Sequence, residues 1–199
     1  MIEQVNLSSN IDMNNLTVDI PVISIDSAVE NVIDIQAATV WVKKFDELLF
    51  KLLLINGPNL NMLGKRDPTQ YGRFTLQDVE NSSIEAATAR GYKMDCFQSN
   101  HEGAIIDKIH ESMDQCDGIV INPGAFTHYS YAIYDALELC GLPIVEIHIS
   151  DIANREAFRR TSVISPACIA QVKGMGLAGY AHAVNILCDT IENNLKKNI

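Results

Sequence analysis

The segment LLLINGP (residues 52–58) joins four consecutive aliphatic residues to an immediate turn sequence. A short apolar run that ends in Asn-Gly-Pro is typical of a buried parallel strand that enters a loop. Later segments with strand-like patterns lie at residues 94–97, 118–121 and 143–147, and a further strand is expected within residues 168–172. The pattern therefore predicts five strands.

Helical patterns alternate with these strands. Thr75, followed by Asp78, predicts a capped helix start, and this helix should end at Gly91. Repeated β-α units with right-handed crossovers form a parallel sheet covered by helices. The predicted fold class is α/β, a flavodoxin-like, doubly wound five-stranded parallel sheet with helices on both faces. The further helices are expected over residues 105–113, 131–139 and 180–195.

The first 50 residues differ in composition from the rest of the chain. They contain no glycine, and two lysines against eight acidic side chains give them a net charge of −6. The remainder carries 13 basic and 17 acidic side chains. Charged extensions are usually solvated. We therefore expect residues 1–50 to be an acidic N-terminal extension that modulates assembly or solubility, and residues 51–199 to be the folded domain.

The whole composition excludes several classes of protein. A net charge of −10 over 199 residues does not suit a general nucleic-acid binder. No apolar run approaches the ~20 residues that span a bilayer, and the N-terminus lacks the basic cluster of a signal peptide. The five cysteines are well separated and contain no CxxC pair, as expected in a reducing compartment. We expect a cytoplasmic protein without a membrane or nucleic-acid partner.

In sheets of this type, ligands bind beyond the carboxyl ends of the strands. The loop after the first strand is long and contains Arg66 and Tyr71. An unperturbed phenol has a pKa of about 10, so a tyrosine serves as a base near neutral pH only where a cation stabilises the phenolate. Arg66 is near enough in sequence to provide that cation. The alternative is an inert tyrosine in an exposed loop.

The loop after the third strand carries two further candidates. Asn122 ends the strand, and His128 precedes a helix whose N-terminus suits an anion. Thr127 or Ser130 is expected to satisfy the first N–H groups of that helix. The alternative interpretation is a simple turn followed by a surface histidine.

The segment EIHISDIANREAFRR (residues 146–160) is the richest in candidates. Glu146 and His148 share one face of the fourth strand, and a neighbouring carboxylate favours the protonated imidazole, which can donate a proton. Arg155 and Arg159 have the spacing of one side of a short helix, from which two guanidiniums can grip a carboxylate. The alternative is a solvated helix whose arginines pair with Glu156.

Several established motifs are absent. The sequence contains no GxSxG elbow, P-loop or HExxH motif, and its five histidines are spread over the domain, so no metal site is expected. Residues 174–179, GMGLAG, fit GxGxxG, but a dinucleotide fingerprint opens the first βαβ unit. We interpret these glycines as tight packing before the last helix.

Residues 51–199 resemble the type II 3-dehydroquinate dehydratases over essentially their whole length. The matching segments are LLLINGPNLNMLGKRDPTQYG, FQSNHEG, INPGAFTHYS, EIHISDIANREAFRRTSVISP and KGMGLAGY. The resemblance implies a cofactor-free anti elimination of water from 3-dehydroquinate, which gives 3-dehydroshikimate through an enolate-like intermediate. Both aromatic biosynthesis and quinate breakdown use this reaction.

The resemblance also implies roles for individual residues. Tyr71 would take the C2 proton, with Arg66 stabilising the charged transition state, and His148 would protonate the departing C1 hydroxyl. Asn122 would hold a water or hydroxyl near the developing enolate oxygen, and Arg155 matches a catalytic lid arginine. The implied substrate-binding positions are Asn59, Asn122, His128, Asp135, Ile149, Ser150 and Arg159, and Glu146 is a supporting residue.

Asp135 matches a residue that the family contributes across a subunit contact, which implies a homododecamer built as a tetramer of trimers. The chain departs from the family at Asp67, Asp151 and Ala157, where Glu, Asn and Glu are usual. These positions flank the catalytic residues, so the departures concern the stability of the lid and not the type of reaction. Two other classes stay open. One is a flavodoxin-like binding module, in which replacing Tyr71 by Phe would be silent; the other is a hydrolase or nucleotide-binding enzyme, for which no motif is present.

Overall fold

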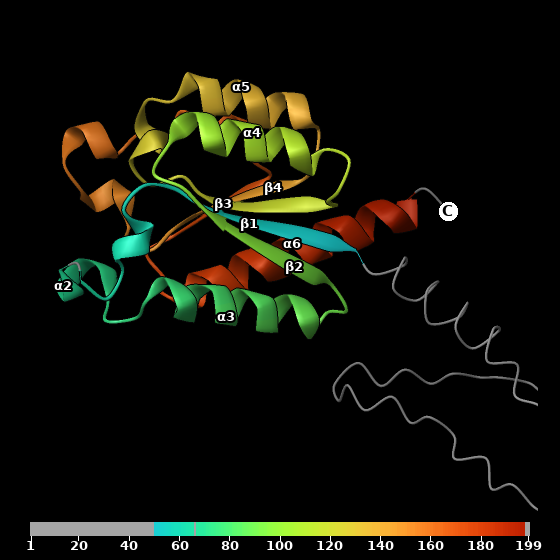
Figure 1. Cartoon of the computed structure of the whole chain (residues 1–199), viewed down its shortest axis with the longest axis horizontal. Coiled ribbons are helices and arrows are strands. Elements are labelled where there is room, and N and C mark those ends of the chain that lie inside the picture. The colour runs from blue at the N-terminus through green and yellow to red at the C-terminus, as the bar shows by residue number, and fades with distance from the viewer. Residues whose placement is uncertain (1–49, 66, 198–199) are drawn as a thin grey trace, which may run out of the picture. The chain divides into compact units, whose positions relative to one another are not determined.

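The computed structural model describes residues 50–65 and 67–197 (Figure 1). The predicted extension, apart from Phe50, and the candidate Arg66 lie outside the described residues. The centre is a five-stranded sheet in the order β2-β1-β3-β4-β5, with every pairing parallel. This arrangement confirms the predicted fold class. The strands are β1 (Lys51–Asn56), β2 (Lys93–Gln98), β3 (Gly118–Asn122), β4 (Ile144–His148) and β5 (Ala170–Lys173).

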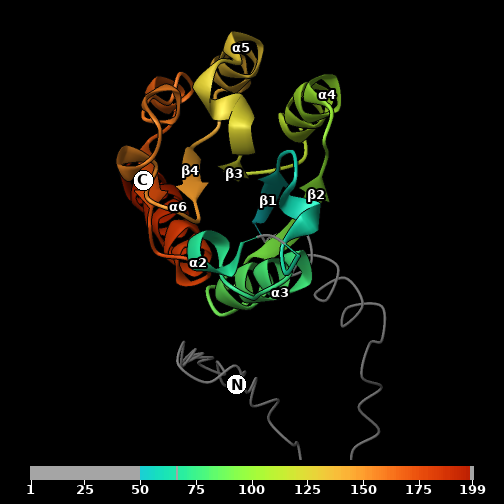
Figure 2. The ribbon, with the colours of Figure 1, turned by 90° about the vertical axis from the view of Figure 1, so that its left-hand side faces the viewer.

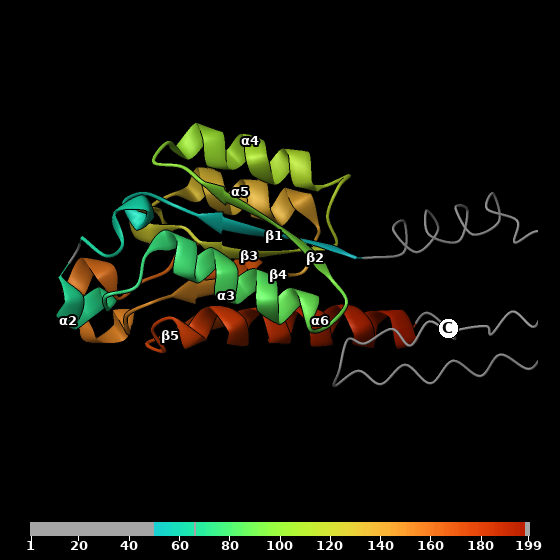
Figure 3. The same ribbon diagram turned by 60° about the horizontal axis from the view of Figure 1, so that its bottom comes forward.

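Helices cover both faces of this sheet (Figure 2). The helices α3 (Leu76–Thr88) and α6 (Ala178–Lys197) pack on one face, where they run side by side (Figure 3). The helices α4 (Glu102–Ser112) and α5 (Tyr131–Cys140) pack on the other. The loops contain the short helix α2 (Pro68–Tyr71) and the 3₁₀ turns η1 (Leu60–Met62), η2 (Gly124–His128), η3 (Ile152–Asn154), η4 (Ala157–Arg159) and η5 (Ser165–Ala167).

The two-sided burial of β1 explains its continuous apolar sequence. Leu52 and Leu54 belong to the core cluster beneath α3 and α6, whereas Leu53 and Ile55 belong to the cluster beneath α4 and α5. All four side chains are at most 1% exposed. A strand covered on both faces needs an apolar residue at every position instead of an alternating pattern.

Two helix starts and one helix end follow the predicted caps, whereas α3 ends at Thr88, three residues before the predicted Gly91. Thr75 and Asp78 form a reciprocal capping box at the start of α3, with the Thr75 N–H donating to Asp78 Oδ2 at 2.7 Å. Ser130 Oγ accepts from the N–H of Ile133 at 3.0 Å at the start of α5, so Ser130 is the cap. Gly141 ends α5 with φ 66°, a left-handed conformation that glycine adopts without steric cost.

The predicted tight packing of the glycines around the start of the last helix is confirmed at Gly179 but not at Gly176, where an added Cβ would have no neighbour within 4 Å. At Gly179 an added Cβ would come within 2.8 Å of Ile147 Cδ1, so a side chain there would push α6 away from β4. All five cysteines are free thiols in the described part of the chain. Burial raises the pKa of Cys96 to about 12 and that of Cys188 to about 11, which keeps both thiols protonated. Within the described residues, no helix has both the length and the apolar character needed to cross a membrane.

Candidate active site

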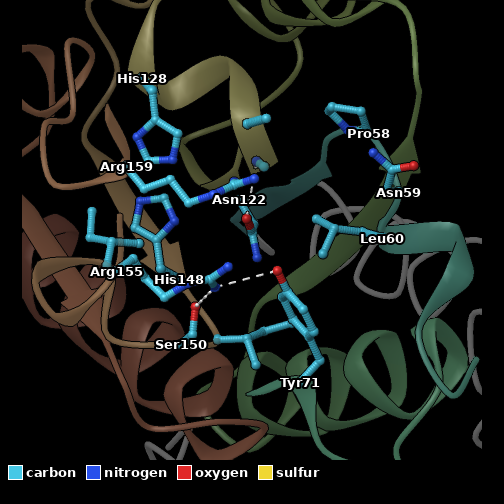
Figure 4. A pocket seen from close by; sticks show the side chains of 14 residues that line it. Pro58, Asn59, Leu60, Tyr71, Asn122, His128, His148, Ser150, Arg155 and Arg159 are labelled. Atoms are coloured by element: carbon cyan, nitrogen blue, oxygen red, sulfur yellow. Dashed lines mark hydrogen bonds between the residues drawn. The ribbon is translucent and has the colours of Figure 1, made fainter. Parts of the chain in front are cut away.

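The loops that follow β1, β3 and β4 surround a pocket at the carboxyl end of the sheet (Figure 4). All the predicted site residues line it except Arg66, which is not described, Glu146, which lies behind His148, and Asp135. The lining residues are Pro58, Asn59, Leu60, Tyr71, Asn122, Gly124, Ala125, His128, His148, Ile149, Ser150, Ile152, Arg155 and Arg159.

A close backbone approach joins the first two of these loops. The N–H of Gly57 donates to the carbonyl of Asn122 at 2.7 Å, and a Cβ on Gly57 would overlap the Pro123 carbonyl. Asn59 then takes up a left-handed conformation with φ 65°, and its N–H donates to Asn100 Oδ1 at 2.9 Å. The Gly57 approach and the Asn59 turn together bring the asparagine to the edge of the pocket.

Tyr71 enters the pocket from the end of α2 and meets a cation there. Arg155 Nη1 donates to Tyr71 Oη at 3.4 Å and to Ser150 Oγ at 3.3 Å (Figure 4). The hydrogen bond to Tyr71 raises the pKa of the Arg155 guanidinium, which therefore stays charged. The contact places a cation beside the phenol oxygen.

His148 lies at the end of β4, where its ring contacts a buried carboxylate. Glu146 is fully buried, and its Oε1 lies 2.7 Å from His148 Nε2. Thr127 Oγ1 and Ser162 Oγ also donate to this carboxylate, and Gln171 Nε2 donates to Oε2 at 2.8 Å. Burial raises the pKa of Glu146, but the bonds from His148, Thr127 and Ser162 outweigh it and hold the pKa below its usual value. The ionised carboxylate holds the histidine ring in a fixed orientation.

His128 presents a neutral ring nitrogen to the pocket. Its Nδ1 lies 2.8 Å from the carbonyl of Thr161, which can only accept, so Nδ1 carries the proton. Burial lowers the pKa of His128, so the ring is neutral near pH 7 and Nε2 is an acceptor. Such a nitrogen can accept a hydrogen bond from a ligand hydroxyl.

The predicted helix carrying Arg155 and Arg159 is wrong. The segment forms two 3₁₀ turns, η3 and η4, because Asp151 caps the first turn and the backbone is extended at Arg155 and Glu156. Both arginines still line the pocket. Glu156 Oε2 lies 3.3 Å from the Nε of each, so the pairing expected as the alternative occurs together with the pocket position.

Asp135 does not line the pocket of its own chain. It lies on the exposed face of α5, between Tyr131 and Leu139, which are 68% and 65% exposed. The three residues have the spacing of one helix face. Among residues 50–65 and 67–197, no group of three or more His, Cys, Asp or Glu side chains is arranged to hold a metal ion.

Most of the residues that support the site were not predicted from the sequence. Thr127 was predicted only as a helix cap, and Ser162, Gln171 and Tyr180 were not predicted. The position of Gln171 could have been inferred from strand pairing, since β5 pairs with β4 and places the Gln171 side-chain amide beside Glu146. Ser162 follows an irregular loop, and no periodicity in the sequence indicates its contact with Glu146.

Comparisons with known proteins identify the family of this chain. The family model Dehydroquinase class II matches residues 50–188. The 3-dehydroquinate dehydratase of Halalkalibacterium halodurans is 53% identical over 138 residues, covering 69% of this chain and 95% of that protein. The crystal structure of a type II dehydroquinase from Butyrivibrio crossotus superposes with a TM-score of 0.68 at 49% identity, covering 70% of this chain and 97% of the other. A type II dehydroquinase from Propionibacterium acnes gives a TM-score of 0.67 at 40% identity, over 70% of this chain and 96% of the other. The chain therefore belongs to the class II dehydroquinase family.

Proposed function

We propose that this protein is a 3-dehydroquinate dehydratase, a hydro-lyase that removes water from 3-dehydroquinate and gives 3-dehydroshikimate without a cofactor. The reaction serves the shikimate pathway, and quinate breakdown uses the same step. The family and the activity named for its relatives support the reaction. The assignment of residues depends on one observation. A single pocket contains a tyrosine that is hydrogen-bonded to a guanidinium and a histidine that contacts a buried carboxylate.

Tyr71 acts as the base. Its phenolate takes a proton from C2 of the substrate, and the electron pair of the C–H bond moves into an enolate on the C3 carbonyl. Arg155, at 3.4 Å, stabilises negative charge on the phenol oxygen before the transfer. Arg66, five residues earlier in the sequence, is proposed to add a second cation.

His148 acts as the acid. When the enolate collapses, the C1–O bond breaks and the departing hydroxyl takes a proton from the imidazolium, so that water leaves. Glu146 holds the ring in place throughout. Tyr71 then releases the C2 proton, His148 regains one from solvent, and the enzyme returns to its starting state. Such matched acid and base groups contribute about 10²- to 10⁴-fold each to a rate.

The remaining polar groups of the pocket bind the substrate. The arginines and the backbone around Ile149 and Ser150 suit its carboxylate, since forked guanidinium bonds fit a carboxylate well. His128 Nε2 accepts a hydrogen bond from a ring hydroxyl of the substrate, and Asn59 binds the substrate from the edge of the pocket. Asn122 holds a water or hydroxyl near the developing enolate oxygen.

We also propose a homododecamer, a tetramer of trimers, in the cytoplasm. The exposed apolar side chains of Tyr131 and Leu139 on either side of Asp135 support a subunit contact through α5. Asp135 would then act in the pocket of a neighbouring subunit. Analytical ultracentrifugation should give the mass of twelve chains, and Asp135→Ala should raise KM; a monomer with full activity would contradict this assembly.

Residues 51–199 are proposed as the catalytic domain, with residues 1–50 modulating assembly or solubility. Deletion of residues 1–48 should leave kcat unchanged and alter solubility or mass. Loss of turnover with the oligomer intact would contradict this division.

The activity is tested by ultraviolet detection of the conjugated enone formed from 3-dehydroquinate, with and without borohydride. Activity that survives borohydride excludes an imine route, and the proposal requires it. A protein that binds 3-dehydroquinate without forming the enone would instead be the binding module considered from the sequence.

A further inference from the structure

The structure assigns a positioning role to Tyr180, a buried residue of α6: its hydroxyl fixes the orientation of the Asn122 side-chain amide. The inference rests on the proposed function, because Asn122 is one of the groups proposed to bind the substrate. Tyr180 itself does not line the pocket. It therefore acts only through Asn122.

A backbone donor sets the direction of the contact. The N–H of Gly124 lies 3.2 Å from one end of the Asn122 amide, and a backbone N–H can only donate, so that end is the oxygen. The nitrogen of Asn122 therefore faces Tyr180 and donates to its hydroxyl at 2.7 Å. The Tyr180 hydroxyl, having accepted, gives its own proton to Asn56 Oδ1 at 3.1 Å.

A solvent molecule cannot easily replace the Tyr180 hydroxyl between Asn122 and Asn56. Its side chain has no exposed surface, and Asn56 is equally buried at the end of β1. The Asn56 oxygen accepts from the phenol, and the Asn56 amide nitrogen has no hydrogen-bond partner among the described residues. The phenol thus links the ends of β1 and β3 from below the pocket.

This orientation decides what the substrate meets. The Asn122 amide nitrogen carries two N–H groups, of which Tyr180 takes one and the other remains for the pocket that Asn122 lines (Figure 4). Asn122 therefore presents a donor, which suits a group that gains negative charge. A rotated amide would present its oxygen, which repels the same group.

The test replaces Tyr180 by Phe and uses Tyr92→Phe as the matched control. Both tyrosines are buried in the same core cluster, but the Tyr92 hydroxyl has no hydrogen-bond partner among the described residues. Loss of one neutral hydrogen bond corresponds to a factor of about two- to tenfold. We expect Tyr180→Phe to lower kcat about five- to tenfold with KM changed less than about twofold, because the donor acts most strongly on the transition state. Tyr92→Phe should leave both constants unchanged.

A double variant separates positioning from a general loss of structure. If Tyr180 acts through Asn122, Tyr180→Phe should cause no further loss of kcat in an Asn122→Ala background. An equal additional loss there, or unchanged kcat in Tyr180→Phe alone, would overturn the inference.

Crystal structures of the wild type and of Tyr180→Phe decide the inference independently of activity. A rotated or disordered Asn122 amide in the variant supports it, and an unchanged amide contradicts it. If the wild type forms no enone, the proposed function fails, and these two structures still test the role of Tyr180.

Discussion

Replacing Glu146 by Gln should lower kcat by about tenfold to 150-fold. The side chain keeps its size, but the charged acceptor 2.7 Å from His148 Nε2 is lost. A hydrogen bond to a charged group contributes about 1.5–3 kcal/mol, and each 1.4 kcal/mol is about a factor of ten. The glutamine side chain also places an N–H₂ group where Glu146 accepts hydrogen bonds. Thr127, Ser162 and Gln171 donate to that position, and they would have to rearrange to accept a hydrogen bond instead.

Steady-state enone formation measures this effect, with Glu192→Gln as the control. Glu192 also accepts from a cation, since its Oε1 lies 2.6 Å from Arg90 Nη2, but this ion pair joins the turn after α3 to α6 and does not line the pocket. The control should keep wild-type kcat. A Glu146→Gln enzyme within about twofold of the wild type would refute the role given to the carboxylate.

The same substitution should change the acid stability of the fold. Because the folded-state pKa of Glu146 lies below its unfolded value of about 4.3, the carboxylate stabilises the fold above that pH. This contribution is lost as the pH falls through the folded-state pKa. Urea unfolding of Glu146→Gln should therefore show a smaller decline in stability below about pH 4.3 than the wild type, and an equal decline would contradict it.

Gly57→Ala should lower the free energy of unfolding by about 1–3 kcal/mol, the usual cost of overpacking, because its Cβ would overlap the Pro123 carbonyl. Denaturant unfolding checks this against Gly103→Ala, which adds a Cβ in open space within α4 and should stabilise by about 0.5–1 kcal/mol; equal effects would be inconsistent with the account. Arg155→Lys should lower kcat about tenfold, since the compact ammonium of lysine does not occupy the position from which Nη1 donates both to Tyr71 and to Ser150. Unchanged turnover in this variant would remove Arg155 from the mechanism.

The parts of the fold that depend on local chemistry were predictable from sequence. The apolar run that ends at Ile55 predicted β1, Thr75 predicted the start of α3, and Gly141 predicted the end of α5. The spacing of Glu146 and His148 predicted their contact, because side chains two residues apart share a strand face.

The parts that depend on long-range packing were not predictable. Tyr180 is 58 residues from Asn122 in sequence, and only the docking of α6 brings its hydroxyl to that amide. The charged segment around Arg155 has helical spacing, but side-chain capping by Asp151 and the extended backbone at Glu156 divide it into two turns. Periodicity describes the burial of a regular helix and carries no information on such local competition.

The central claim is the division of labour between Tyr71 and His148, and exchange of the C2 hydrogen tests it most directly. With 3-dehydroquinate in D₂O, a His148→Ala enzyme should incorporate deuterium at C2, as observed by NMR, while it forms almost no enone. Tyr71→Phe should catalyse neither exchange nor dehydration. Deuterium incorporation by Tyr71→Phe at the rate of the His148→Ala enzyme would contradict the account, because another group would then be removing the proton.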